Sequence, residues 1–390
     1  MTAEKFMEVD YFQNYKKDQK IPGDVFLSKK VSEERAIIIL SDGLGSGVKA
    51  NVLATLTATM ARNYVSNLYD VRQTAEVIMR TLPVCKTRKI SYATFTIADV
   101  NKNGDTRIIE YGNPTFLYIK GKQAVDPGKL NRKKLGDYKN DELKFYSFNC
   151  DKQDRIIFFS DGVTQAGMGS EKYPFGWGRD QVCKYVTLII RRENEISAQE
   201  LSKNVVQQAV NKDGYNSKDD TTCGVIYFRS PRKMTLVTGP PYDEQRDSEM
   251  AQTLEEARGK KVICGGTTAK IIARELDKDL AVEINNTGDE IPPNASMEGV
   301  DLITEGVLTL SKLYKLLQED KPRFQEPVLK KLYYSLLDSD IINFICGTRI
   351  NEAHQDPKIP IELGLRRQVV KKIASLLEEK YLKETKIEYI

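Results

Sequence analysis

Aspartate residues stand at the borders of apolar runs in four segments of the sequence, most of them beside glycine. The segments are IIILSDG, which ends at Asp42-Gly43, IIFFSDG, which ends at Asp161-Gly162, IPGDVF, which carries Asp24, and DDTTCGVIYF, which begins with Asp219-Asp220. A carboxylate at the end of a buried strand is costly unless its pKa shifts or a cation neutralises it. Mg²⁺ and Mn²⁺ prefer oxygen ligands, and a following glycine lets a backbone carbonyl approach the ion. The pattern therefore indicates a divalent metal site.

Each segment alone also has an ordinary structural explanation, because Ser-Asp-Gly is a common turn sequence. Three separated acids at strand borders within one half of the chain are harder to explain in that way. The chain has one histidine, His354, so a Ser-His-Asp triad or a site with several histidine ligands would depend on that residue. If the protein is an enzyme, we expect oxygen ligands to carry its chemistry.

The elements that must position these acids follow from apolar periodicity over residues 1–229. Short β-branched or alternating runs predict strands, and four-residue spacing of apolar residues predicts helices. The predicted strands cover residues 36–40, 93–97, 107–111, 115–119, 143–148, 155–160 and 224–228, and the predicted helices cover 46–68, 71–82 and 197–210. Many of the strands are joined by short turns, so we expect largely antiparallel sheets.

The rhythm changes at the segment RSPRK, residues 229–233, and predicts a second domain over residues 230–390. Strand, glycine loop and helix then alternate, which is typical of a mainly parallel sheet with crossover helices. Loops at the carboxyl edge of such a sheet are where ligands bind. The candidate ligand residues in these loops are Gly239, Gly265, Gly266, Thr267, Glu305 and Gly347. Efficient strand-to-helix turns explain the same glycines equally well, and the loops match no nucleotide-binding motif.

The whole-chain composition excludes several classes of protein. The 390 residues include 59 basic and 55 acidic ones, and a net charge of +4 does not indicate a nucleic-acid-binding protein. The N-terminus is too polar for a signal peptide, and no apolar run reaches about 18 residues. The six cysteines have no paired spacing. We therefore expect a cytoplasmic protein without membrane insertion.

The motifs GDVF, SDGLGSGVKA, ATFTIADV, FSDGVTQAGMG and DDTTCGVIYF occur in this order over residues 20–229. Together they resemble the SpoIIE-type branch of the PPM metal-dependent serine/threonine protein phosphatases. The resemblance implies an αββα sandwich of two mainly antiparallel sheets flanked by helices, followed here by a smaller α/β domain. It also implies two Mn²⁺ or Mg²⁺ ions at one edge of the sandwich. Residues 230–390 resemble an α/β accessory domain of phosphatases linked to iron hydrogenases, which would make this half a sensor.

Carried over position by position, the resemblance gives each acid a role. Asp42 bridges the two metals, Gly43 offers its carbonyl, and Asp161 and Asp219 are further carboxylate ligands. Asp24 is an outer-shell acid, and Asp220 is either a ligand or a loop cap. Many relatives carry glutamate where this chain has Gln165, which is not expected to be a ligand.

The function implied is hydrolysis of phosphoserine or phosphothreonine by a hydroxide that bridges the metals. The substrate would be a small bacterial signalling protein, for example a STAS-fold anti-sigma-factor antagonist, and the C-terminal domain would regulate the reaction through a small ligand. A homodimer is among the expected assemblies. The alternative is a catalytically weak phosphatase-fold scaffold or sensor, whose main role is to bind a ligand or partner through the C-terminal domain.

Overall fold

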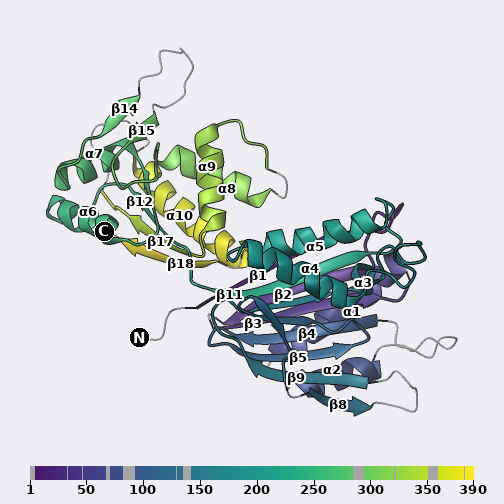
Figure 1. Ribbon diagram of the computed structural model, residues 1–390. Helices are drawn as coiled ribbons and strands as arrows, with labels where there is room; N and C mark the ends of the chain where they lie inside the picture. Colours follow the sequence, from purple (N-terminus) through teal and green to yellow (C-terminus); the bar gives the residue numbers. More distant parts are fainter. Residues whose placement is uncertain are drawn as a thin grey trace. The chain divides into compact units, whose positions relative to one another are not determined.

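The chain divides into two compact units, Met1–Ser230 and Pro231–Ile390, called here the first and second unit (Figure 1). The computed structural model describes residues 5–32, 34–45, 47–66, 71–81, 93–128, 130–134, 142–283, 294–319, 322–349, 359–381 and 383–390. His354 lies outside these described residues.

The described part of the first unit contains two antiparallel sheets. One has the order β1 (Phe6–Asn14), β11 (Thr221–Arg229), β10 (Arg155–Phe159), β6 (Leu117–Lys120) and β7 (Gln123–Val125). The other has the order β2 (Asp24–Ser32), β3 (Arg35–Gly43), β4 (Ala93–Asn101), β5 (Asp105–Tyr111), β9 (Glu142–Asn149) and β8 (Leu130–Lys134). The helices are α1 (Gly47–Ser66), α2 (Val71–Thr81), α3 (Asp161–Gln165), α4 (Arg179–Arg192) and α5 (Ala198–Lys212).

Strand alternation assigns each face of these sheets to a layer. In β3, Ile37 and Ile39 pack with apolar residues of α1 and α2. Ile38 and Leu40 face the other way and pack with residues of β10 and β11 in the first sheet. The opposite face of that sheet packs on α4 and α5. The layers are therefore helix, sheet, sheet and helix, and the predicted αββα sandwich is confirmed.

The described part of the second unit contains a parallel sheet in the order β16 (Leu302–Thr304), β13 (Lys260–Cys264), β12 (Lys233–Thr238), β17 (Ile341–Cys346) and β18 (Glu384–Tyr389). A short hairpin of β14 (Ala281–Glu283) and β15 (Asn294–Ser296) is antiparallel. The helices are η1 (Glu244–Arg246), α6 (Asp247–Glu256), α7 (Gly266–Glu275), α8 (Val307–Gln318), α9 (Pro327–Asp338) and α10 (Ile359–Tyr381). The prediction of a mainly parallel α/β unit is confirmed.

The strand order of the second unit creates a switch point in its middle. The chain starts at β12, moves outward on one side through β13 and β16, and then returns to β17 on the other side of β12. One face of the sheet packs on α8, α9 and α10, and the other packs on α6 and α7. The carboxyl ends of β12 and β17 therefore lie side by side, and the next helices along the chain, α6 and α10, pack on opposite faces of the sheet.

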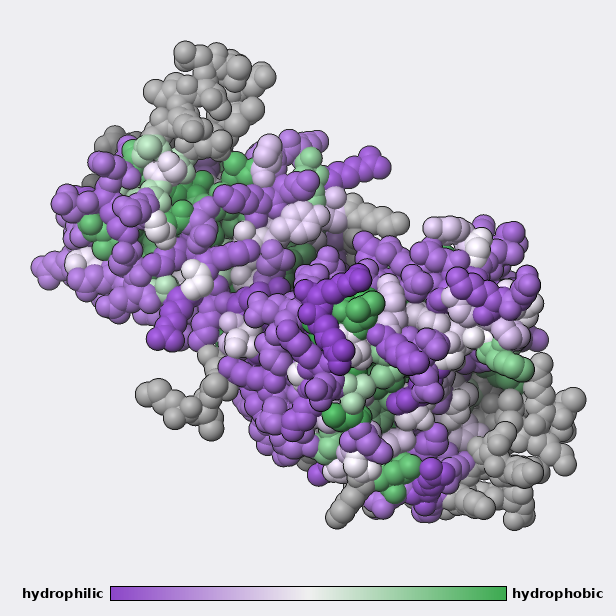
Figure 2. All heavy atoms as spheres, in the orientation of Figure 1, coloured by the Kyte–Doolittle hydropathy of each residue, from purple (hydrophilic) through white to green (hydrophobic). Residues whose placement is uncertain are grey.

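Apolar side chains are mostly inside both units. In Figure 2, hydrophilic side chains cover most of the face in view and hydrophobic ones form small separate patches. None of the helices in the described ranges combines the length and the apolar character needed to traverse a bilayer.

Candidate active site

Four of the predicted acids meet at one end of the sandwich. Asp24 and Asp42 are direct partners across β2 and β3, so their side chains share one face of the sheet. Asp161 begins α3 directly after β10 and lies close enough to Asp42 for its charge to raise the pKa of Asp42. Asp219 precedes β11 and lies close enough to raise the pKa of Asp42 through its charge. Residues that are almost 200 positions apart in the chain thus gather around Asp42.

The electrostatics of this cluster reflect burial together with mutual repulsion. Burial is the largest effect on Asp42 and raises its pKa well above the ordinary value, and the charges of Asp24, Asp161 and Asp219 raise it further. Burial likewise raises the pKa of Asp24 to about 7, against hydrogen bonds that lower it. The pKa of Asp161 is raised by burial, and that of Asp219 by burial and then by the charge of Asp161. The charges with the largest effects on the pKa of Asp42, those of Asp24, Asp161, Asp219 and Asp220, are all negative.

Gly43 and Gly162, which follow Asp42 and Asp161, are required by close backbone packing. A Cβ at Gly43 would overlap the backbone carbonyl of Ala50 in α1, and a Cβ at Gly162 would overlap the backbone carbonyl of Asp220. Neither glycine has a positive φ, so the reason is space and not conformation. The Asp-Gly pairs therefore let α1 and the 219–220 segment approach the strand ends that carry the acids.

Asp220 has a different environment from its neighbour Asp219. Its Oδ1 accepts a hydrogen bond from the backbone N–H of Lys16 (2.9 Å), and its Oδ2 accepts one from the backbone N–H of Gly23 (2.7 Å). The residue is only 3% exposed. Both carboxylate oxygens are thus engaged by the connection between β1 and β2, which favours the interpretation of Asp220 as a loop cap.

Polar side chains that the sequence analysis did not select hold the acids in place. The Thr222 hydroxyl donates to Asp24 Oδ2 (2.6 Å), and the Gln13 amide donates to the Thr222 hydroxyl (3.0 Å). The Gln165 amide donates to Asp161 Oδ2 (2.8 Å), one helical turn along α3. The i, i+4 spacing of Gln165 and Asp161 was the sequence signal for this last contact. Nothing in the sequence indicated Gln13, because it lies on a strand that we had not predicted.

The donor set fits hard divalent cations by its chemistry. Within the described ranges, no three His, Cys, Asp or Glu side chains already have the spacing of a metal site. The cluster nevertheless offers carboxylate oxygens whose charges repel one another, and a divalent cation prefers such oxygens and would neutralise them. The acids best placed for this are Asp42, Asp161 and Asp219, since both oxygens of Asp220 are already occupied.

The candidate ligand loops of the second unit all follow strands at the carboxyl edge of its sheet, and they form two pairs. The Gly265 N–H donates to the carbonyl of Thr304 (2.8 Å), which brings Gly265, Gly266 and Thr267 beside Glu305. A Cβ at Gly347 would overlap the carbonyls of Gly239 and Pro240, so these two loops touch at the switch point. The structure thus separates the candidate residues into an outer pair of loops and a central pair.

Comparison with known families agrees with the geometry of the first unit. A sequence profile described as Stage II sporulation protein E (SpoIIE) matches residues 32–229, about half of the chain. The chain belongs to the SpoIIE family. The predicted SpoIIE resemblance is therefore confirmed for residues 32–229, which lie in the first unit.

Solved structures of related domains are similar at low sequence identity. The PP2C phosphatase domain with a fragment of the regulatory domain of SpoIIE from Bacillus subtilis is 16% identical, with a TM-score of 0.48, over 58% of this chain and 64% of that one. The RsbU and RsbW domains of Rv1364c from Mycobacterium tuberculosis are 20% identical, with a TM-score of 0.46, over 64% of this chain and 68% of that one. The chain thus spans less than two thirds of the first of these structures. No curated protein matches the chain in sequence.

Proposed function

We propose that the first unit hydrolyses phosphoserine or phosphothreonine on a small bacterial signalling protein, using two Mn²⁺ or Mg²⁺ ions. Asp42, Asp161 and Asp219 would hold the ions together with the Gly43 carbonyl, and Asp24 would act from the outer shell. The observation that carries the proposal is the convergence of these acids, whose pKa values are raised by burial and by one another. Bound divalent ions supply charge neutralisation at phosphate oxygens and lower the pKa of water.

The residues around the acids have supporting roles in this proposal. Gln165 fixes the orientation of Asp161 through its amide, and Thr222 does the same for Asp24 through its hydroxyl. Such outer contacts typically change metal affinity by about 10- to 100-fold when they are removed. Asp220 ties the connection between β1 and β2 to the strand end and acts as a positioning residue.

The test is hydrolysis of p-nitrophenyl phosphate by the full chain, with Mn²⁺, with Mg²⁺ and with EDTA. We expect activity only with a divalent ion, and we expect Asp42→Asn to abolish it while the protein stays folded. Asp99→Asn is a matched control, since Asp99 is a buried aspartate on the neighbouring strand β4 that pairs with Arg35. Activity that survives in EDTA or in Asp42→Asn would overturn the mechanism.

The alternative function, a scaffold with little turnover, is separated by calorimetric titration with Mn²⁺. The proposed enzyme should bind metal with a stoichiometry of about two, as expected for a two-metal site, and should lose this binding in Asp42→Asn. A scaffold would bind no metal pair and would show no metal-dependent hydrolysis.

We also propose that the second unit binds a small anion at its switch point and thereby regulates the first. Open α/β sheets bind ligands outside the carboxyl ends of strands at such points. Here the Thr238 hydroxyl at the end of β12 is buried and has no hydrogen-bond partner within the described ranges. The Arg366 guanidinium lies against Gly239, where a Cβ would overlap it, and donates to the Gly347 carbonyl (3.3 Å). A cation, a buried hydroxyl and two glycines suit a carboxylate or phosphate group.

Thermal unfolding of the full chain with inorganic phosphate or malonate tests this ligand site. The experiment is done in EDTA and in the Asp42→Asn background, so that the first unit contributes little binding. We expect a rise in the transition of the second unit that is lost in Arg366→Gln. Equal shifts in both proteins would overturn the proposal. A cytoplasmic location, a STAS-fold substrate and a homodimer remain predictions, and light scattering of the purified chain tests the last.

A further inference from the structure

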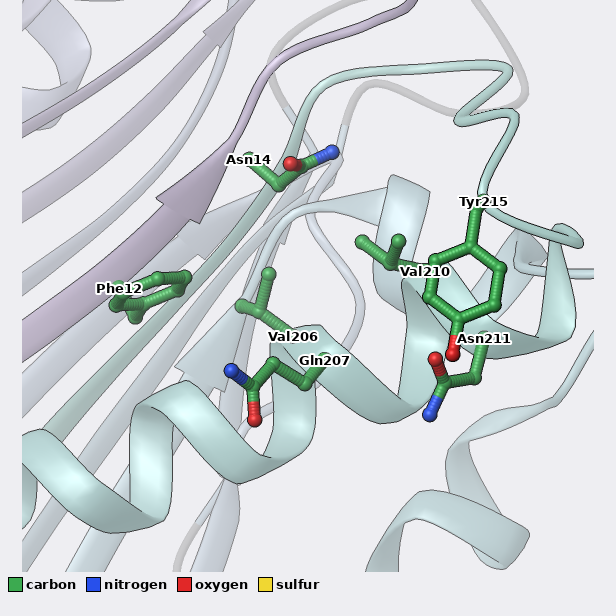
Figure 3. Close-up of a pocket in the computed structure, with 7 residues that line it drawn as sticks. All are labelled: Phe12, Asn14, Val206, Gln207, Val210, Asn211 and Tyr215. Atoms are coloured by element: carbon green, nitrogen blue, oxygen red, sulfur yellow. The ribbon is translucent and has the colours of Figure 1, made fainter.

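A cavity of about 430 Å³ opens between the strand β1 and the helix α5 of the first unit (Figure 3). Its lining consists of apolar and carboxamide side chains, namely Phe12, Asn14, Val206, Gln207, Val210, Asn211 and Tyr215. No acidic or basic side chain lines it. In Figure 3 the Tyr215 ring stands beside Val210 and Asn211, and Phe12 lies at the other end. An uncharged apolar group with hydrogen-bonding atoms at its rim suits this lining.

Tyr215 is held at this cavity in an unusual backbone conformation. It follows the end of α5 with a φ of 61°, in the left-handed region, where glycine or asparagine is the ordinary choice. Its backbone N–H donates to the carbonyl of Val210 (3.0 Å), which fixes the turn. The side chain is nonetheless 80% exposed. An aromatic ring kept at a strained and exposed position gains nothing for the core, and such positions cluster at binding sites.

The strand that forms one wall of the cavity is an edge strand. Within the described ranges, β1 pairs with β11 on one side and has no strand on the other. The lining comes from β1, α5 and the residues after α5, and not from the inner strands, so the cavity lies along this open edge. An extended peptide can add to such an edge through main-chain hydrogen bonds, with one side chain in an adjacent pocket.

Hydrogen bonds connect the cavity to the acid cluster. The Asn14 amide donates to the Ser217 hydroxyl (2.8 Å), and the Lys16 N–H donates to Asp220 Oδ1 (2.9 Å). Tyr215 and Asp219 are four residues apart, so their Cα atoms are separated by at most about 14 Å. The two segments between cavity and acids are basic, with Lys16, Lys17, Lys20 and Lys218. Their charge is complementary to a phosphorylated segment that approaches the acids.

We propose that the cavity is a docking site for an extended segment of the phosphoprotein substrate. The inference rests on the proposed phosphatase function and adds a specificity rule to it. An uncharged large apolar side chain enters between Phe12 and Tyr215, and the peptide backbone pairs with the β1 edge and the carboxamides. The phosphorylated residue then lies within about four residues of this side chain, at the acids.

The test uses synthetic phosphoserine peptides of alanine, glycine and serine, each with one phenylalanine at a different distance from the phosphoserine. Hydrolysis by the full chain with Mn²⁺ is followed as kcat/KM, with p-nitrophenyl phosphate as the anchor-free substrate. We expect one narrow range of spacing to raise kcat/KM by about ten- to a hundredfold through a lower KM.

Two variants separate docking from catalysis. Tyr215→Gly removes the ring and relieves the strained conformation, and Gln207→Trp fills the cavity from an exposed helix position. Both should lose the spacing preference and keep wild-type hydrolysis of p-nitrophenyl phosphate. Tyr242→Ala, another highly exposed tyrosine, is the matched control and should behave as wild type.

The outcomes distinguish a failure of the docking site from a failure of the proposed phosphatase function. If wild type hydrolyses p-nitrophenyl phosphate but shows no preferred anchor spacing, the docking site is overturned and the phosphatase function stands. The same holds if the preference survives in both variants. If wild type hydrolyses no phosphate ester, the proposed function itself fails.

Discussion

Adjacent aspartates at positions 219 and 220 should respond in opposite ways to the same substitution. In the native protein the two carboxylate oxygens of Asp220 accept hydrogen bonds from two backbone N–H groups. In Asp220→Asn the side-chain oxygen can accept only one of these bonds, and the NH₂ group faces the other N–H, which loses its acceptor. A hydrogen bond to a charged group contributes about 1.5–3 kcal/mol, and a buried donor left without a partner costs a similar amount. Because the lost bond and the unpaired donor belong to the same contact, we expect a loss of about 1.5–3 kcal/mol in the free energy of unfolding.

Asp219→Asn should leave the stability of the metal-free protein unchanged or slightly higher. The pKa of Asp219 is raised by burial and then by the charge of Asp161, so a neutral amide relieves both effects. Its Oδ1 accepts from the Asp220 N–H (3.0 Å), and asparagine retains that oxygen. Since the side chain is partly exposed and its charge is screened, the gain should stay below about 1 kcal/mol.

Urea unfolding in EDTA measures both effects in the first unit alone, because Trp177 is the single tryptophan of the chain and is buried there. With an m-value of about 2–3 kcal/mol/M, Asp220→Asn should lower the urea midpoint by about 1 M. Hydrolysis should show the complementary pattern, lost in Asp219→Asn and retained below the unfolding transition in Asp220→Asn. Equal midpoints for the two variants would refute the assignment of Asp220 as a loop cap.

Three further predictions concern the same unit. In EDTA the stability of the first unit should fall as the pH rises from 5 to 8. The pKa of Asp24, about 7, lies above the ordinary value that it has in the unfolded chain, so the folded state holds a proton that the unfolded state has released. Thermal unfolding at several pH values tests this, and a flat profile would contradict it. Gln165→Ala should weaken Mn²⁺ binding by about tenfold in calorimetric titration, since Asp161 loses its orienting amide; unchanged affinity would mean that the contact has no role. Gly162→Ala should lower the free energy of unfolding of the first unit by about 1–3 kcal/mol in urea, because the new Cβ would overlap the Asp220 carbonyl. Gly266→Ala in the second unit has open space around it and should leave stability nearly unchanged. Equal small effects of the two substitutions would show that close packing does not require Gly162.

The parts of the fold that the sequence predicted are those with strong apolar runs. The segments AIIIL and RIIFF predicted the buried strands β3 and β10, and their outcome agrees with the prediction. β1 was not predicted, because its sequence FMEVDYFQN mixes charged and aromatic residues. As an edge strand it buries little, so no clean alternation is required of it. The last strand, β18, was missed for the same reason.

The site could be predicted only in part. The types of residue and their positions at strand ends indicated a cation, and the family resemblance assigned their roles. Asp24 lies opposite Asp42 because β2 and β3 are consecutive antiparallel strands, but β2 was not predicted, so this register could not be foreseen. The two hydrogen bonds that separate Asp220 from Asp219 likewise come from a connection about 200 residues earlier in the chain.

The register of the parallel sheet in the second unit determines whether two of its cysteines can form a disulfide bond. Cys264 and Cys346 end β13 and β17, and both are in register with Thr238 on the strand between them. Neighbouring strands are about 4.8 Å apart, so the Cα atoms of the two cysteines lie about 9–10 Å apart, beyond the roughly 7 Å that a disulfide allows. Oxidants therefore cannot cross-link this pair while β12 stays in place, and bridged cysteines in a mass spectrum would report that the sheet had opened.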